Sequence, residues 1–202
     1  VAVQHDDDWS YSEDRTFSTG AIPLSLAWTA AEGTPRPGYG VTSLIHVPSI
    51  VAILDGDGEY VWWYEVGYGA LPGGNAMVTR NSLARDGRSM LFLAWTPQYP
   101  GLDCTTGRDL VRIDLDGSAM ETWLVTGGHH DFVELPDTSV AVLAYDPLIW
   151  DGAELVGDRL VEVAPDGSER EVWSLWDTVS PEPGVEYGNG TDFSHANALR
   201  FD

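Results

Sequence analysis

The sequence contains no lysine and a single cysteine, and each scarcity excludes a kind of chemistry. All ten basic residues are arginine, so neither a Schiff-base lysine nor a phosphate-loop lysine is present. The one thiol, Cys104, has no second cysteine with which to form an intrachain disulfide. No run of about 18 apolar residues occurs, so the sequence predicts no transmembrane helix. Since 43% of the residues are hydrophobic, the composition is that of a globular chain without a disulfide framework.

Positive charge is scarce along the whole chain. The 202 residues include 10 basic and 32 acidic side chains, which gives a formal net charge of -22. Such a charge repels phosphate backbones and anionic lipid head groups, so neither a nucleic-acid partner nor a membrane partner is predicted. Asp6, Asp7 and Asp8 stand in a row near the start, and residues 31–40 are rich in proline and glycine. We therefore predict an acidic, Pro/Gly-rich arm over residues 1–40.

Short apolar or alternating runs, separated by turn signals, begin at about residue 41. The runs are rich in Val, Ile, Leu, Trp and Tyr, and no window of helical length has apolar residues at three-and-four spacing. This pattern predicts an all-β fold. Strands are expected over residues 43–54, 59–66, 89–95, 109–115, 120–125, 130–135, 140–145, 159–163, 171–176 and 193–201.

Two sequence elements recur along the chain. The first is a hairpin over residues 53–63, 113–123 and 161–173, each with a strand, an Asp-Gly turn and a strand carrying tryptophan. The second element aligns residues 79–86 with 129–136 and 195–202. One repeat therefore takes about 50 residues, which is typical of a four-stranded β-propeller blade. The alternative is a β-sandwich whose hairpins are similar by coincidence.

The repeats divide residues 41–202 into blades. We expect a partial blade at 41–78, whole blades at 79–126 and 127–191, and the start of another at 192–202. A propeller closes with about four to eight blades. The chain is therefore expected to cover three to four blades of an incomplete ring, and the remaining blades or another chain would close it.

Histidine stands at the same repeat position in two blades, at the start of the innermost strand. These residues are His129 and His195. The innermost strands of a propeller line the central channel, so we expect the two imidazoles to converge. Because strand side chains alternate, Asp131 should lie on the same side as His129, and Asn197 on the same side as His195. His130 is the other candidate in the first of these strands.

Such a cluster has several possible uses. Imidazole is a nucleophile or general base near neutral pH, and imidazolium and carboxamide groups donate hydrogen bonds to oxyanions. The histidines could instead satisfy the backbone of a crowded channel. Metal binding is a further alternative, although the spacing matches no ligand motif. His5 and His46 are isolated in the sequence and are expected to have no such role.

Three segments resemble bacterial arylsulfotransferases. They are GGHHDFVELP (127–136), DGSEREVW (166–173) and DFSHANAL (192–199). The resemblance implies a six-bladed propeller, periplasmic or secreted, that moves a sulfuryl group from an aryl sulfate to a phenol through a transiently sulfated histidine. It implies no nucleotide or other cofactor and no metal. Sulfate binding would fall to His195, Asn197 and one of His129 or His130.

The same resemblance assigns no residue of this chain as the nucleophile. In the family that histidine, and a sulfate-binding arginine, belong to later blades. Two alternative functions therefore stay open at this point. One is a non-catalytic propeller that binds a ligand or a protein, because propellers host many functions. The other is a quinoprotein-like dehydrogenase, which the tryptophan-bearing blades suggest more weakly.

Overall fold

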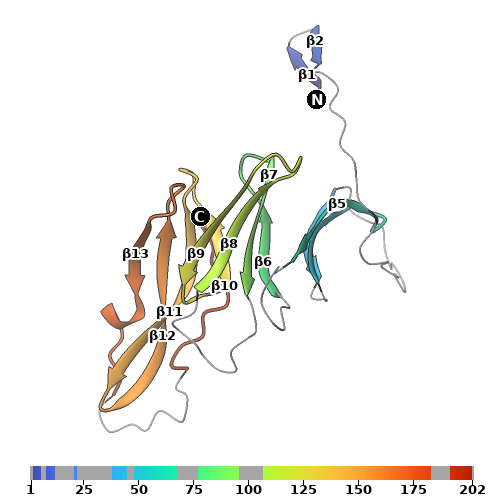
Figure 1. The fold of residues 1–202 in the computed structure, drawn as a ribbon. Coiled ribbons are helices and arrows are strands. Elements are labelled where there is room, and N and C mark those ends of the chain that lie inside the picture. Colours follow the sequence, from blue (N-terminus) through green and yellow to red (C-terminus); the bar gives the residue numbers. More distant parts are fainter. Residues whose placement is uncertain are drawn as a thin grey trace.

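The computed structural model describes residues 2–5, 8–11, 21, 38–44, 48–67, 77–95, 107–182 and 192–201. These residues form antiparallel sheets and one short 3-10 helix, with no α-helix among them, so the predicted all-β class is confirmed (Figure 1). The strands are β1 (Ala2–His5), β2 (Asp8–Tyr11), β3 (Gly40–Leu44), β4 (Ser49–Leu54), β5 (Tyr60–Val66), β6 (Met77–Leu83), β7 (Ser89–Trp95), β8 (Gly107–Asp114), β9 (Met120–Thr126), β10 (Gly128–Glu134), β11 (Val140–Trp150), β12 (Ala153–Val163) and β13 (Glu169–Ser174), and the 3-10 helix η1 spans Leu175–Asp177.

Each large sheet is a simple meander in chain order. The first sheet is β3-β4-β5, the second β6-β7-β8-β9 and the third β10-β11-β12-β13. The first strands of the three sheets are neighbours, because β6 contacts both β3 and β10. A separate two-stranded hairpin, β1-β2, lies within the predicted arm, so part of that arm is paired backbone. Figure 1 shows the second and third sheets side by side, with their strands running in similar directions.

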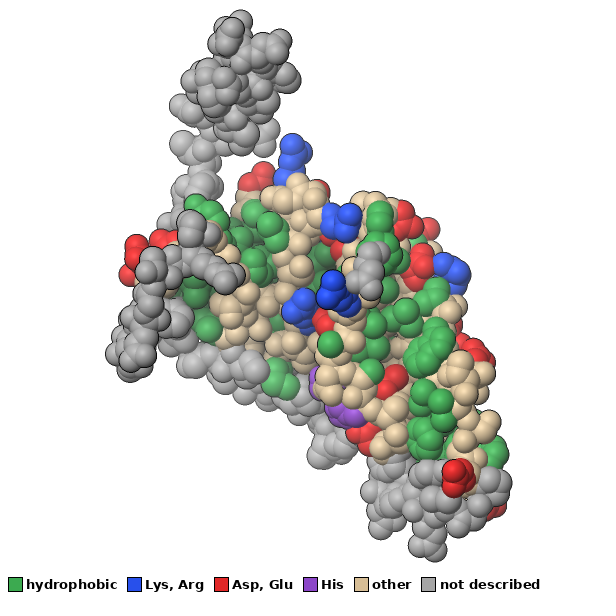
Figure 2. Space-filling model, turned by 180° about the vertical axis from the view of Figure 1, so that it is seen from behind, with side chains coloured by type: hydrophobic (Ala, Val, Ile, Leu, Met, Phe, Trp, Pro, Cys, Tyr) green, Lys and Arg blue, Asp and Glu red, His purple; other side chains and the backbone are tan. Residues whose placement is uncertain are grey.

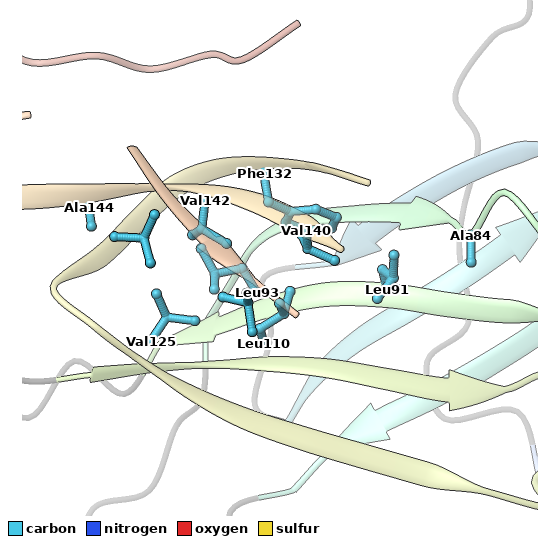
Figure 3. Packing of buried hydrophobic residues seen from close by; sticks show 11 residues of the cluster. Ala84, Leu91, Leu93, Leu110, Val125, Phe132, Val140, Val142 and Ala144 are labelled. Atoms are coloured by element: carbon cyan, nitrogen blue, oxygen red, sulfur yellow. The ribbon is translucent and has the colours of Figure 1, made fainter. Parts of the chain in front are cut away.

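The core lies between the sheets. Side chains alternate along β7, so that Leu91 and Leu93 join a cluster with the third sheet while Met90 and Phe92 join a cluster with the first. Figure 3 shows the first of these clusters, in which Val142 of β11 lies close to Leu93. Both faces of the second sheet are therefore buried at β7, which explains why this strand is apolar from Met90 to Trp95.

The three predicted Asp-Gly hairpins are β4-β5, β8-β9 and β12-β13. In each turn the glycine N–H donates to the carbonyl three residues earlier, at 3.1 Å for Gly58, 2.8 Å for Gly117 and 2.8 Å for Gly167. All three glycines have positive φ, between 73° and 82°. The prediction that each glycine supplies the left-handed conformation of its turn is confirmed.

Tryptophan of one sheet contacts the outer turn of the next. Trp62 Nε1 donates to the carbonyl of Leu115 at 2.8 Å, between the first and second sheets. The Trp123 ring lies against Gly167, between the second and third, where a Cβ would come within 2.6 Å of Trp123 Cδ1. Trp173 of the third sheet has the same strand register as Trp123 and is 40% exposed. The same kind of contact therefore joins both pairs of stacked sheets.

The structure corrects several predicted strand limits. The run 43–54 is two strands, β3 and β4. The hairpin β11-β12 is much longer than predicted. Asp151 and Gly152 both have positive φ and close a tight turn. Pro147 argued against a strand at this point of the sequence, so the continuation of β11 was not predicted. Residues 193–201, predicted as a strand, are irregular. Among the described residues, the one isolated bridge here joins Val156 to Asp192, the residue just before this segment.

Candidate functional site

A bulge at the start of β10 carries two of the predicted site residues. Gly128 pairs with Ala144 and Phe132 pairs with Val142, so three residues of β10 stand opposite one residue of β11. His130, inside this bulge, has a φ of 51°, in the left-handed region. Alternation along an ideal strand therefore does not apply here, and the common side of His129 and Asp131 stays a prediction. His129 lies against Tyr145 and Asp158, whereas Asp131 contacts Arg80 and the Leu199 amide.

His129 is buried beneath the bulge. Its ring is 4% exposed and stacks on Tyr145, with the ring centroids 4.1 Å apart and the planes inclined by 17°. His129 Nε2 lies 3.0 Å from Asp158 Oδ1, but the approach is not aligned as a hydrogen bond. Neither ring nitrogen has a well-directed partner among the described residues. His129 therefore retains hydrogen-bonding capacity that a ligand could use. An unmade buried hydrogen bond costs about 1–3 kcal/mol, which a ligand supplying the partner would recover.

Asp158 of β12 holds the C-terminal segment against the third sheet. The residue is 2% exposed, and its Oδ2 accepts hydrogen bonds from Ser194 Oγ at 2.6 Å and from the Ala196 N–H at 3.0 Å. Burial acts to raise the pKa of Asp158, but contact with His129 and these two hydrogen bonds outweigh it, and the pKa lies below its ordinary value. Asp158 is therefore a carboxylate at neutral pH.

Asp131 is a second anchor for the same segment. Its Oδ2 accepts a hydrogen bond from the Leu199 N–H at 2.8 Å, and its Oδ1 lies 3.0 Å from Arg80 Nε of β6. Residues 192–199 are therefore positioned by two buried carboxylates, Asp131 and Asp158, rather than by a strand ladder. This is why a segment with the composition of a strand is irregular.

His195, on this anchored segment, meets His130. The two Nε2 atoms are 2.8 Å apart, and His195 Nδ1 forms a hydrogen bond with Asp192 Oδ2. The ring centroid of His130 lies 4.8 Å from that of His195 and 5.2 Å from that of His129. We call His129, His130 and His195 the histidine cluster. Figure 2 shows histidine side chains reaching the surface next to acidic ones.

The electrostatic surroundings keep His130 neutral. Burial lowers its pKa first, and the neighbouring imidazoles of His129 and His195 lower it further. Asp158 and Asp192 act in the opposite direction without reversing the shift. Since the ordinary histidine pKa of 6.5 is already below neutrality, His130 carries no charge at pH 7.

Of the site residues predicted from the sequence, the three histidines lie together and Asn197 lies beside them. The structure brings His129, His130 and His195 together, so both histidines between which the sequence left the choice open are in the cluster. Asn197 is exposed, and its Nδ2 donates to the carbonyl of His195 at 2.9 Å. The described contacts do not join its side chain to the imidazoles. Asn197 fixes the backbone beside His195.

Sequence reasoning missed the carboxylates of the site. Asp192 stands three residues before His195 in a segment already singled out, so its proximity was available as a signal. No comparable signal pointed to Asp158, because this residue lies on another strand of the sheet and the predicted strand began one residue after it. Tyr145 was predicted at the end of a strand, and nothing in the sequence indicated that its ring stacks on His129.

Other candidate sites are not supported by the described residues. No group of three or more His, Cys, Asp or Glu side chains in this part of the chain is arranged to hold a metal ion. Cys104 and His46 lie outside the described residues, as does the side chain of His5. Within the described ranges, no helix has the length and apolar character needed to cross a membrane.

Comparison with known proteins gives no match. No family model, curated protein or solved structure matches the chain. We therefore argue function from the geometry of the histidine cluster.

Proposed function

We propose that the chain forms part of a β-propeller similar to the arylsulfotransferases, whose histidine cluster binds the sulfuryl group of an aryl sulfate during transfer to a phenol. The stacked meanders, the adjacent first strands β3, β6 and β10, and the repeated contact of tryptophan with a turn all favour blades of a propeller. Further blades, from a longer chain or another chain, would close the ring. An exported location belongs to the same proposal.

The distance between His130 and His195 carries this proposal. At 2.8 Å between their Nε2 atoms, the two imidazoles share one proton, with one nitrogen donating and the other accepting. If the pair takes up a second proton, two N–H groups face each other and need an acceptor between them. An oxyanion supplies that acceptor and forms charge-assisted hydrogen bonds with both. His129 offers a third buried donor beside them.

Binding of an anion should therefore require proton uptake. Asp158 lies against His129 and Asp192 against His195, so these carboxylates would stabilise a cluster that has taken up a proton. A neutral His130 gives the site too little positive charge to hold a sulfate ester against a chain of net charge -22. Affinity should rise as the pH falls through the range in which histidine titrates.

Calorimetric titration of the 202-residue chain with 4-nitrophenyl sulfate tests the proposal. We expect affinity to increase by up to about tenfold per pH unit between about pH 8 and pH 6, as expected for uptake of one proton. His195→Ala should abolish this binding. Arg88→Ala, which removes an exposed positive charge from a turn of the second sheet, should leave it unchanged.

Two results would contradict the proposal. One is affinity that does not depend on pH, and the other is affinity that survives in His195→Ala. Sulfuryl transfer to a phenol is assayed alongside, and we expect none from this chain, since the resemblance assigns the nucleophile to other blades. If the ring is completed with further blades and still binds without transfer, the chain is a non-catalytic anion-binding module.

A further inference from the structure

Three side chains of the site form a continuous hydrogen-bonded chain. Asp192 Oδ2 pairs with His195 Nδ1, and His195 Nε2 pairs with His130 Nε2 at 2.8 Å. An ionised carboxylate only accepts hydrogen bonds, so it fixes a proton on His195 Nδ1. The Nε2 of a neutral His195 is then the acceptor, and His130 Nε2 must donate. The remaining lone pair of the chain is on His130 Nδ1.

His130 Nδ1 is available for a substrate. The contact with His195 is the one hydrogen bond that the His130 ring makes among the described residues. The backbone of His130 is held in the left-handed region, with φ 51°, by the bulge of β10. Such conformations cost about 1–3 kcal/mol and occur preferentially at functional sites. The bulge therefore orients the His130 imidazole toward His195.

We propose that His130 Nδ1 is a general base that removes the proton from the hydroxyl group of an acceptor, oriented through His195 by Asp192. That the acceptor is a phenol rests on the proposed function; the relay itself rests on the geometry alone. His130 is the catalytic residue of this step, because it contacts the reacting hydroxyl. His195 and Asp192 are positioning residues.

The proton transfer balances within the relay. The hydroxyl proton moves to His130 Nδ1, and the oxygen keeps the electron pair of the broken O–H bond. The proton on His130 Nε2 moves to His195 Nε2, so His130 returns to a neutral form and His195 becomes an imidazolium. Asp192 is the counterion of that imidazolium, which makes the transfer more favourable than it would be to an isolated imidazole.

Nitrogen NMR of the three histidines tests the relay directly. The 202-residue chain is labelled with 15N-histidine and studied without ligand at about pH 7.5, where the ordinary histidine is neutral. We expect His130 to be protonated on Nε2 and His195 on Nδ1. Asp192→Asn should remove the preference of His195 and raise the fraction of His130 protonated on Nδ1. Asp137→Asn, the same change in an exposed turn, should alter neither.

Chemical modification gives a second readout. Diethyl pyrocarbonate acylates the free lone pair of a neutral imidazole, so peptide mapping should find His130 modified before His195 and His129. The rate at His130 should fall several-fold in Asp192→Asn and stay the same in Asp137→Asn. Circular dichroism verifies that each variant is folded, and His195→Gln provides a second break in the relay if Asp192→Asn is not.

The outcomes separate this inference from the proposed function. If His130 is protonated on Nδ1, or charged at about pH 7.5, the relay is wrong even where 4-nitrophenyl sulfate binds. If the predicted tautomers are found and the sulfate ester does not bind, the proposed function fails and the relay stands. Equal modification of His130 in the wild type and in Asp192→Asn would also overturn the relay.

Discussion

The second and third sheets are built alike, and the start of the first strand distinguishes them. Both are four-stranded meanders, and Val78 pairs with Ala94 in one as Gly128 pairs with Ala144 in the other. After this pair, β6 has one extra residue relative to β7, whereas β10 has two relative to β11. The additional residue lies in the bulge that contains His130. The site therefore arises from a local lengthening of one strand on a repeated framework.

The turns that follow β6 and β10 compensate for the additional bulge residue of β10. The amide of Ala84 donates to Ser89 in the second sheet, and the amide of Leu135 donates to Ser139 in the third, so the later turn is one residue shorter. Thr138, in the shorter turn, has a φ of 71°. The third sheet thus holds two non-glycine residues in the left-handed region near its first strand, which indicates that the bulge is maintained at a cost in backbone strain.

Strands β8 and β12 carry opposite charges at an equivalent buried position. Asp109 pairs with Ala94 and Arg159 pairs with Ala144, so the preceding residues, Arg108 and Asp158, are equivalent. Both are buried. A carboxylate at this position in the third sheet accepts hydrogen bonds from residues 194 and 196, which the arginine of the second sheet cannot do.

The largest expected effect follows from that carboxylate. Asp158→Ala leaves Ser194 and the Ala196 amide without their acceptor and removes the carboxylate beside His129, and it should lower the free energy of unfolding by about 3 kcal/mol. Glu162→Gln, on the same strand, removes a charge from a solvent-exposed ion pair with Arg170 and should cost about 0.5 kcal/mol or less. Urea denaturation of the two variants measures both. Equal effects would mean that Asp158 does not anchor the segment.

The Asp158 effect should depend on pH. The pKa of Asp158 is lower in the folded chain than its ordinary value of 3.8. Its stabilisation is therefore fully present above that value and is lost as the pH falls through the folded pKa. The difference in stability between the wild type and Asp158→Ala should be constant from about pH 7 to pH 5 and shrink below about pH 4. A difference that grows on acidification would contradict the pairing.

A smaller effect distinguishes the outer turns of the two sheets. Gly167 and Gly117 both have positive φ, but a Cβ on Gly167 would collide with the Trp123 ring, whereas a Cβ on Gly117 meets open space. Gly117→Ala should cost about 1 kcal/mol for its conformation alone. Gly167→Ala should cost about 2–3 kcal/mol, because the ring must also move. Thermal denaturation compares them, and similar losses would argue against packing of Trp123 on that turn.

The bulge itself is tested by paired substitutions. Asparagine tolerates the left-handed region better than alanine, so His130→Asn should be more stable than His130→Ala by about 0.5–1 kcal/mol. Thr79, the extra residue in the bulge of β6, is not among the residues of positive φ. Thr79→Asn should therefore have no advantage over Thr79→Ala. An asparagine advantage at both positions would show that the two bulges do not differ in strain.

The smallest effect concerns surface charge. With a net charge of -22, self-repulsion should weaken the fold at low ionic strength, and salt that shortens the Debye length to about 10 Å should raise the thermal midpoint by a few degrees. Buried contacts are screened little. Salt should therefore raise the midpoints of the wild type and of Asp158→Ala equally. A flat or falling midpoint would remove the repulsion argument.

The sequence predicted the repeated parts of the fold better than the site. Alternation, Asp-Gly turns and tryptophan positions are local signals, and they located the hairpins at Gly58, Gly117 and Gly167. The alignment of the repeats predicted that His129 and His195 occupy the same repeat position and lie near each other. The extra residue of the β10 bulge could not be seen, because the shorter turn cancels it: equivalent residues are 50 positions apart both before the bulge and after the turn.

The carboxylates escaped prediction for a different reason. Asp158 acts on residues 36 and 38 positions away, and Asp131 on a residue 68 positions away. In a chain with 32 acidic side chains, no local pattern separates the buried carboxylates from those on the surface. Their roles follow from burial and from the irregular backbone of residues 193–201, which only the three-dimensional structure provides.

The most direct test of the account is a crystal structure of the chain with selenate, an isostere of sulfate that is located by the anomalous scattering of selenium. The account predicts one ion whose oxygens lie about 3 Å from Nε2 of both His130 and His195, at a concentration that saturates binding in solution. The ion should be absent from this position in His195→Ala crystals. Selenate bound only to exposed arginines, with the histidine cluster empty, would contradict the account.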